Sequence, residues 1–213
     1  MYVPEHFAMA EAAVQRLLVE HGAGDLITAT SQGLLATMLP FVFDPAAGPR
    51  GSLLGHLARN NDQWRHPAVG EALVILRGPD AYVTPSWYAS KAEHGRVVPT
   101  WNYVTAHVYG ELVVHDDGEW LADNVHRLTE KHEAGRTAPW SVEDAPPAFV
   151  AGQLRAVVGV EVQVTRIEAK AKLSQNRPAI DVDGVIAGLR EDGRPDVAEA
   201  VARATGRGGT AGA

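Results

Sequence analysis

The sequence contains no cysteine in its 213 residues. Disulfide bonds, thiol catalysis and cysteine-based zinc sites are therefore all excluded. A chain of this length buries roughly 70% of its unfolded surface on folding, so a core can stabilise it without such cross-links. The absence also fits a reducing compartment, and we expect the protein to be cytoplasmic.

Positive charge and long apolar runs are scarce as well. The 26 acidic residues outnumber the 19 basic ones, which gives a formal net charge of −7, and no Lys/Arg cluster suggests the basic face of a DNA-binding domain. No segment approaches the roughly 18 apolar residues of a membrane-spanning helix. The first residues lack the basic start and apolar centre of a signal peptide. We therefore expect no membrane association, and the charge does not support direct DNA binding.

Hydrophobic periodicity and turn residues divide the chain into strands and helices. Alternating patterns predict strands at 26–31, 34–43, 51–57, 71–78, 81–87, 101–115 and 157–173. Helical patterns predict helices at 6–21, within 58–69, at 119–133, within 141–154 and within 181–204. The first two strands form a hairpin, and Gly78-Pro79-Asp80 predicts a turn between the fourth and fifth.

The strands largely follow one another in hairpin order, with helices at the start, middle and end of the chain. This order differs from the strand–helix alternation of a parallel sheet and predicts an α+β fold built on an antiparallel barrel or sheet. We expect residues 1–204 to form a single domain with N- and C-terminal helices. The Gly-rich residues 205–213 predict a flexible tail.

The stretch 51–65 brings a histidine and several anion-binding residue types to a strand end. A strand delivers His56, and Arg59, Asn60 and Gln63 follow at the opening of a short helix. Backbone N–H groups at a helix start are unsatisfied and favour an anion, which an adjacent Arg also binds. In the alternative interpretation an asparagine caps the helix and Arg59 is a solvated surface residue.

Two further strand ends carry hydrogen-bond donors. At the end of one strand, Ser86, Trp87 and Lys91 offer a hydroxyl, a ring for stacking and a cation, unless the rings only pack at a turn. In 170–177, donors such as Lys172, Ser174 and Gln175 are concentrated at the end of the last strand, where a solvated turn is the alternative.

The stretch VPTWNYVTAHVYG at 98–110 begins with two large rings around an amide. Because Trp101 and Tyr103 are two residues apart, they share one face of a strand, and Asn102 points to the other. The rings face either the core or a ligand. Neither a His-Glu-x-x-His metal motif nor a Gly-x-Ser-x-Gly hydrolase motif occurs, so the residues predict no metal site and no catalytic triad.

Five segments taken in order give a family resemblance. MYVPEHF, GHLARNNDQW, YVTPSWY, VPTWNYVTAHVYG and KLSQNR resemble the PaiB family of FMN-binding negative transcriptional regulators. The resemblance spans nearly the whole chain. It implies the FMN-binding split-barrel fold, shared with pyridoxamine phosphate oxidases and flavin reductases, and a homodimer with FMN in a groove between the subunits.

The resemblance also implies which residues contact FMN. Strand 34–41 would lie along the flavin ring, and residues 56–58 would follow it. Arg59, Asn60 and Gln63 would reach the phosphate, for which Lys91 is a second candidate. Residues 101–103 or 172–176 would come from the partner subunit. The cofactor contacts implied in this way are Thr37, Leu39, Pro40, His56, Leu57, Ala58, Arg59, Asn60, Gln63, Ser86, Trp87, Lys91, Trp101, Asn102, Tyr103, Lys172, Ser174 and Gln175.

Two functions remain open from the sequence. The resemblance implies an FMN-binding transcriptional repressor, for which DNA binding is possible from the family label but unsupported by the charge. The alternative is an FMN-dependent oxidoreductase of the flavin reductase or pyridoxamine phosphate oxidase kind acting on a small substrate, with His56 and His107 as candidate proton donors.

Overall fold

The computed structural model describes residues 1–208, which fold into two compact units. One unit contains Met1–Val14, Arg77–Ala106 and the chain from Glu168 onward. The other contains Gln15–Leu76 and His107–Ile167. Three long strands contribute residues to both units.

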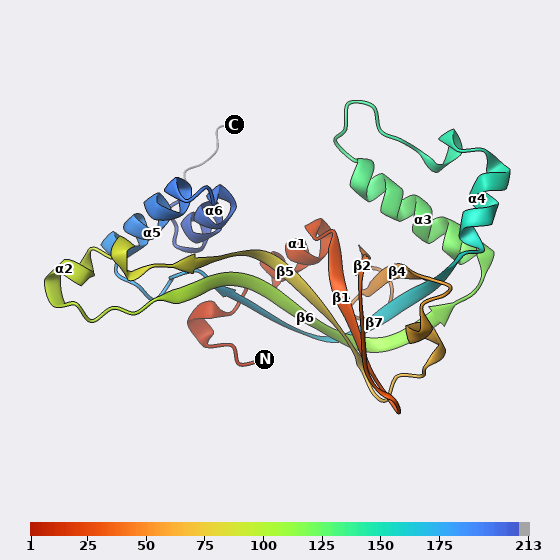
Figure 1. Cartoon of the computed structure of the whole chain (residues 1–213), viewed down its shortest axis with the longest axis horizontal. Coiled ribbons are helices and arrows are strands. Elements are labelled where there is room, and N and C mark those ends of the chain that lie inside the picture. Colours follow the sequence, from red (N-terminus) through yellow and green to blue (C-terminus); the bar gives the residue numbers. More distant parts are fainter. Residues whose placement is uncertain (209–213) are drawn as a thin grey trace. The chain divides into compact units, whose positions relative to one another are not determined.

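Seven strands form one antiparallel sheet in the order β2-β1-β5-β6-β7-β4-β3 (Figure 1). This is the split-barrel sheet with helices that the sequence predicts, and it is not closed by hydrogen bonds between its edge strands. The strands are β1 (Ala23–Thr30), β2 (Gly33–Pro40), β3 (Val42–Asp44), β4 (Ser52–Ala58), β5 (Ala72–Val83), β6 (Thr100–His115) and β7 (Val157–Lys172).

A single residue joins the two edges of this sheet. β2 ends at Pro40 and β3 begins at Val42, so the chain passes from one edge to the other through Phe41, which is 2% exposed. The backbone N–H of Phe41 donates to Gly22 O at 3.2 Å. The open barrel is therefore bridged by the covalent chain, in the second unit, rather than by a strand pair.

The prediction of two strands at 71–78 and 81–87 is wrong, because β5 runs unbroken through Gly78 and Pro79. A Cβ on Gly78 would lie 2.9 Å from the Cβ of Val104, so this glycine allows close approach to β6 rather than a turn. The pairing of β5 with β1 extends from Leu73 to Ile75, and Pro79 therefore removes no N–H from that ladder.

The predicted helices are present with different bounds, and one helix, α2 (Ser90–His94), forms in a segment where the sequence patterns predicted none. The N-terminal segment predicted as one helix is a 3₁₀ turn, η1 (Glu5–Phe7), followed by α1 (Glu11–Glu20), and the short helix in 58–69 is the 3₁₀ turn η2 (Asp62–Arg65). The remaining elements are η3 (Pro85–Trp87), α3 (Gly118–Glu133), η4 (Val142–Asp144), α4 (Pro147–Leu154), α5 (Ala179–Glu191) and α6 (Pro195–Ala204). None of the helices in residues 1–208 is long and apolar enough to cross a membrane.

The core of the first unit is built by α5, α6 and the end of β5. Val83, Val185 and Leu189 are fully or almost fully buried there, and Trp87 packs against them. Its indole lies over Gly188 of α5, where a Cβ would come within 2.3 Å of the ring. Trp87 is therefore a packing residue of this core, which is the structural alternative that the sequence left open.

The tail predicted at 205–213 begins with ordered residues. Thr205 Oγ1 donates to Val201 O at 2.7 Å, and the backbone N–H groups of Arg207 and Gly208 both donate to Ala202 O. Residues 209–213 lie outside the described residues.

The close contact between Trp87 and Gly188 gives a stability test. Gly188→Ala must displace the indole or the helix, and we expect it to lower the free energy of unfolding by about 1–3 kcal/mol. Gly152→Ala in α4 is the matched control, because its added Cβ meets only an Arg155 nitrogen at 3.9 Å. The control should be neutral or raise stability by about 0.5–1 kcal/mol through helix propensity. Urea denaturation measures both, and equal effects of the two substitutions would contradict this packing role.

Candidate functional site

The exposed end of β4 positions the first group of predicted site residues. Leu57 is 2% exposed and points into the core, so its side chain is not available to a ligand. His56 and Ala58 lie on the opposite face of the strand, and His56 is half-buried while Ala58 is exposed. Arg59 and the exposed Asn60 follow directly.

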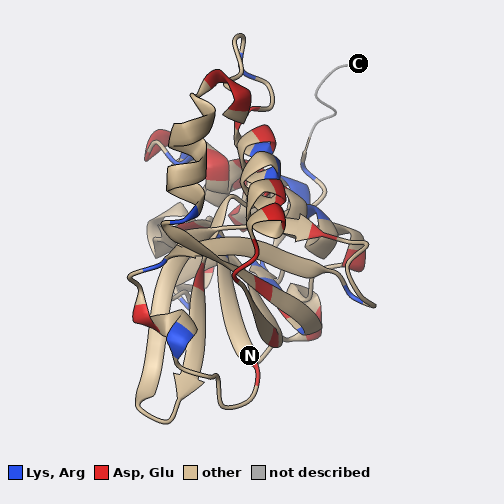
Figure 2. Ribbon diagram, turned by 90° about the vertical axis from the view of Figure 1, so that its right-hand side faces the viewer, with Lys and Arg blue, Asp and Glu red and all other residues tan. Residues whose placement is uncertain are grey.

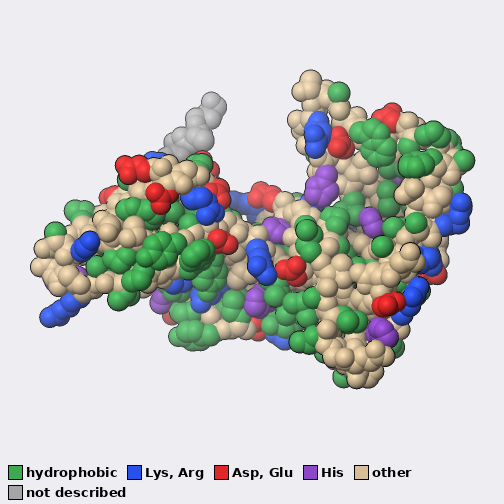
Figure 3. Space-filling view, viewed as in Figure 1, with side chains coloured by type: hydrophobic (Ala, Val, Ile, Leu, Met, Phe, Trp, Pro, Cys, Tyr) green, Lys and Arg blue, Asp and Glu red, His purple; other side chains and the backbone are tan. Residues whose placement is uncertain are grey.

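His56 opens onto two adjoining hollows in the second unit. One, of about 230 Å³, lies between β4 and the helical segment after β6, with Val125, Trp140 and Phe149 among its walls. The other, of about 300 Å³, shares His56, Val125 and Trp140 and also reaches Pro40. We call this pair of hollows the His56 groove. In Figure 3, hydrophobic side chains with histidines among them gather over α3 and α4.

A buried amide lies behind His56. Asn124 of α3 is 1% exposed, and its Nδ2 lies 3.4 Å from His56 Nδ1. With the Asn124 amide assigned in this orientation, its Nδ2 donates to Nδ1, and the imidazole proton is then assigned to Nε2. The Oδ1 atom of Asn124 is buried without a hydrogen-bond partner, which is costly and unusual in a packed interior. Burial lowers the pKa of His56 below its ordinary value, so the ring is neutral at pH 7.

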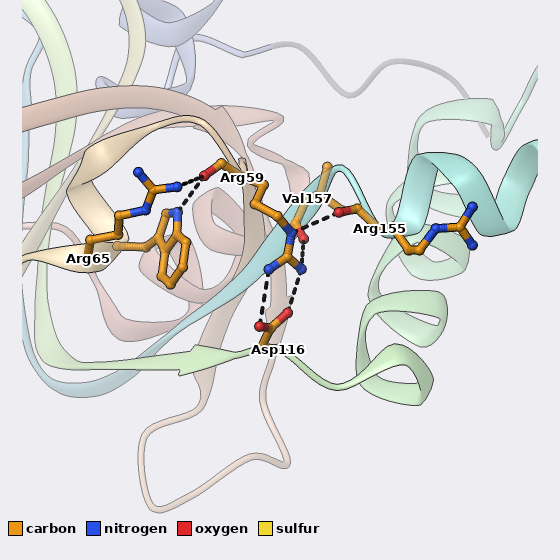
Figure 4. A network of polar contacts seen from close by, with 6 residues as sticks. Arg59, Arg65, Asp116, Arg155 and Val157 are labelled. Carbon is orange, nitrogen blue, oxygen red and sulfur yellow. Dashed lines mark hydrogen bonds and ion pairs between the residues drawn. The ribbon is translucent and has the colours of Figure 1, made fainter.

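Arg59 is held by a network at the junction of β4, β6 and β7 (Figure 4). Its guanidinium donates to both carboxylate oxygens of Asp116, at 3.1 and 2.5 Å. It also donates to the carbonyls of Arg155 and Val157, at 2.8 and 3.0 Å. The hydrogen bond from Arg59 lowers the pKa of the Asp116 carboxyl. The fork that we expected to bind a phosphate is therefore occupied by Asp116 in this structure.

The Arg59 carbonyl is also engaged. Trp64 Nε1 donates to it at 3.0 Å, and Arg65 donates to it at 3.2 Å. Asn61 caps the η2 turn by accepting from the backbone N–H of Gln63 at 2.9 Å. Asn61 thus supplies the cap of the alternative interpretation, but Arg59 is paired with Asp116 rather than free in solvent.

Thr37 and Gln63, both predicted to contact FMN, are brought together inside the barrel. Thr37 Oγ1 donates to Gln63 Oε1 at 2.6 Å. Gln63 is 3% exposed, and its Nε2 has acceptors at Leu26 O and Thr28 Oγ1. The amide of Gln63 therefore connects β1, β2 and η2 instead of facing a phosphate. Leu39 is also buried, at 3% exposed.

The first unit separates Trp101, Asn102 and Tyr103 as the strand alternation requires. Trp101 is 50% exposed and tilts toward Tyr82, which is 49% exposed, with ring centroids 6.3 Å apart. The ring centroid of Tyr103 lies 5.5 Å from Lys170 Nζ. Asn102 is fully buried and donates to Ser174 Oγ at 3.0 Å. The two rings remain available to a ligand, whereas Asn102 and Ser174 satisfy each other.

The other donors of the first unit are partly committed as well. Lys172 Nζ donates to Thr100 Oγ1 and, at 3.0 Å, to Trp101 O. Burial lowers the Lys172 pKa, and Lys170 and Arg177 lower it further. Gln175 is used locally, since it accepts from Leu173 N and donates to Ala171 O. Ser86 on η3 and Lys91 on α2 are exposed, and Lys91 Nζ donates to Ser86 Oγ at 3.3 Å.

The sequence interpretation missed Asn124, Trp140, Phe149 and Asp116. Asn124 could have been noticed, because it lies on the same face of α3 as Leu121 and Leu128, three and four residues away. A polar residue within an apolar stripe indicates a buried contact. The positions of Trp140 and Phe149 follow only from how the loop after α3 folds back.

The environment of His56 gives a pH test. The folded-state pKa of His56 is lowered, so its contribution to stability is present above the unfolded pKa of about 6.5 and is lost as pH falls below it. The pKa of His126 is raised, first by its contact with Ala122 O and then by Glu143. NMR titration of the histidine Cε1–H signals should therefore show His56 titrating below His126, and the reverse order would contradict the buried position of His56.

Comparisons with known proteins agree with this architecture. Residues 1–166 match the family described as "Putative FMN-binding domain". "Protease synthase and sporulation protein PAI 2" of Bacillus subtilis is 33% identical over 198 residues, which cover 92% of each chain. In fold, the chain is similar to the flavocytochrome Anf3 of Azotobacter vinelandii (TM-score 0.59, 13% identity, 80% of this chain and 72% of that one). It is also similar to the conserved hypothetical protein Rv2991 of Mycobacterium tuberculosis (TM-score 0.57, 15% identity, 84% and 94%). The resemblance to the PaiB family is thus confirmed, and the chain belongs to this family of FMN-binding domains.

Proposed function

We propose that this protein binds FMN as a homodimer and acts as a flavin-dependent regulator of the PaiB type. Membership of an FMN-binding family over residues 1–166 is the observation that carries the proposal. The relative PAI 2 is named for protease synthesis and sporulation, which fits a regulatory role. The cytoplasm is the compartment we expect, because the chain lacks cysteine.

The exposed residues of the first unit fit the chemistry of FMN. The cofactor combines a flat aromatic ring with a dianionic phosphate, and it supplies redox chemistry when bound. Trp101 and Tyr82 offer exposed ring faces for stacking. Lys170, Lys172 and Arg177 place three cations near one another, a suitable environment for a phosphate.

Exposed apolar side chains on the strands support a second copy as partner. Leu34 and Met38, on the outward face of β2, are 76% and 68% exposed. In the first unit, hydrophobic side chains cover much of the visible face over β5 and β6 (Figure 3). Such surfaces favour association, and flavin bound between subunits would use residues from both.

Regulation through direct DNA binding is not favoured by the charges. Lys and Arg are interspersed with Asp and Glu along the ribbon in Figure 2. A PaiB-type regulator with this surface acts through a protein partner or through a surface formed by the dimer.

A second function, a flavin-dependent oxidoreductase, is supported by the His56 groove. A neutral histidine with a proton on Nε2 faces mostly apolar walls there, an arrangement suited to proton donation to a small substrate. Oxidation of NAD(P)H by the FMN-loaded protein in the presence of an acceptor would favour the enzyme. A salt-sensitive shift of promoter DNA or capture of a defined partner without turnover would favour the regulator.

FMN binding itself is tested by the absorption spectrum of the purified protein and by fluorescence titration with FMN. We expect a flavin spectrum and a dissociation constant in the micromolar range or below, as expected for a resident cofactor with about 8 kcal/mol of binding free energy. Absence of binding at micromolar FMN would overturn the proposal. Size-exclusion chromatography with light scattering, with and without FMN, tests the dimer.

Arg59 of the second unit is the alternative phosphate contact to the cations of the first unit, and its partner Asp116 gives a test of it. If Arg59 binds the phosphate, Asp116 competes for the same fork, and Asp116→Asn should strengthen FMN binding several-fold. Riboflavin lacks the phosphate, so its affinity should not change. Arg59→Ala should weaken FMN binding by about 1.5–3 kcal/mol, as for a lost charged hydrogen bond. Equal effects of Asp116→Asn on FMN and riboflavin would show that the Arg59 pair is only structural.

Trp101 tests the ring contact in the same assay. Trp101→Ala should weaken FMN and riboflavin equally, by about 0.5–1.5 kcal/mol, because stacking acts on the ring and not on the phosphate. Val98→Ala is the control, since Val98 is also exposed, at 64%, but has no ring. An unchanged affinity of the Trp101 variant would remove this residue from the site.

A further inference from the structure

The His56 groove has the composition of a small-molecule site. The polar residues that line its smaller hollow are His56 and Gln153, and the other lining residues are apolar, including Trp140 and Phe149. The two hollows measure about 230 and 300 Å³, near the lower end of the roughly 300–1,000 Å³ typical of ligand pockets. A compound of one or two rings is the size that fits.

The titratable residue that lines both hollows is His56, while Gln153 lines the smaller hollow and Thr129, His132 and Glu133 line the larger one. His56 is backed by Asn124, whose Nδ2 lies 3.4 Å from His56 Nδ1. With Nδ1 accepting, Nε2 carries the proton and can donate a hydrogen bond to a ligand. Asn124 is itself 1% exposed and has an unpartnered Oδ1, so a buried polar group is maintained here although it costs stability.

Charge further limits the ligand. Neither hollow is lined by Lys or Arg among the described residues. The acidic residue of the larger hollow, Glu133, pairs with Arg136 at 3.2 Å and accepts from Trp140 N at 3.0 Å. An anion would therefore lose its hydration next to a carboxylate without gaining a cationic partner.

From these features we propose that the His56 groove binds an uncharged aromatic compound that carries a hydrogen-bond acceptor, such as an aryl ketone, with the acceptor on His56 Nε2–H and the rings between Trp140 and Phe149. His56 is the specificity-determining residue of this site, and Asn124 is the positioning residue that sets its tautomer. The family resemblance implies His56 as an FMN contact, and this proposal assigns His56 to a second ligand instead. It does not rest on the flavin contacts proposed for the first unit.

Three naphthalene derivatives that differ in one substituent test the proposal by isothermal titration calorimetry. 2-Acetylnaphthalene carries a neutral acceptor, 2-ethylnaphthalene has none, and 2-naphthoate is charged. We expect the acetyl compound to bind about tenfold more tightly than the ethyl compound, the effect of one hydrogen bond, and more tightly than the carboxylate. Equal affinity for the acetyl and ethyl compounds, or strongest binding of the carboxylate, would overturn the proposal.

Substitution of the histidine gives the residue-level test. His56→Phe should abolish the preference for the acetyl over the ethyl compound, and His94→Phe, at an exposed histidine, should leave it intact. A preference that survives in the His56 variant would contradict the assignment. If that variant does not fold, histidine-ring ¹⁵N spectra of the unmodified protein decide. The His56 Nε2 signal should move with the acetyl compound and not with the ethyl compound, and an unmoved signal would overturn the proposal.

Competition with FMN shows whether the groove belongs to the flavin. Saturating FMN should change the affinity for 2-acetylnaphthalene by less than twofold. Competitive displacement would assign the groove to the flavin ring and overturn a separate site. A protein that binds the naphthalene but not FMN would contradict the proposed function and leave this inference standing.

Discussion

The half-buried ammonium of Lys131 holds α3 against the point where the chain passes between the two sheet edges. Lys131 Nζ donates to His21 O at 2.5 Å and to Phe41 O at 2.9 Å. Burial lowers the pKa of Lys131, which shows the cost of keeping a cation there, and the two carbonyls offset part of it. Because α3 carries Asn124 and Val125, this contact fixes one wall of the His56 groove relative to β4. Lys131 thus stabilises both the passage of the chain between the two sheet edges and the candidate ligand site.

Buried amides have a second organising role. Gln63 links β1, β2 and η2, and Asn102 pairs with Ser174 between β6 and the end of β7. The sequence interpretation assigned these residues to cofactor binding. A sequence does not distinguish an amide that faces a ligand from one that bonds to a neighbouring strand. Only the fold shows that their hydrogen-bonding capacity is used within the protein. The motifs that carry the family resemblance therefore contain residues that build the scaffold as well as residues free to bind.

The sequence predicted the fold class and most elements correctly, because β6 and β7, of 16 residues each, alternate over part of their length and the helices have clear apolar faces. It failed at β5. Gly78 and Pro79 are typical turn residues, but they lie within this strand, where Gly78 allows β5 and β6 to approach closely. At the site, local chemistry singled out His56 and Arg59, whose contact with FMN stays a prediction. The sequence interpretation could not find Asp116, because its partner Arg59 is 57 residues away in the sequence. It could not find Trp140, because the position of this residue depends on the path of a loop. Such long-range pairing has no local signal in a single sequence.

The passage of the chain through Phe41 has a consequence for how this barrel can vary in length. One residue spans the gap between β2 and β3, and its length therefore fixes the distance between the two edges of the barrel. An extra residue at this point would shift the register of one edge strand and turn its buried side chains outward. The Ser31-Gln32 turn between β1 and β2 carries no such constraint and can accept additions at the surface. Tolerance to insertion should therefore differ sharply between two neighbouring connections of the same sheet.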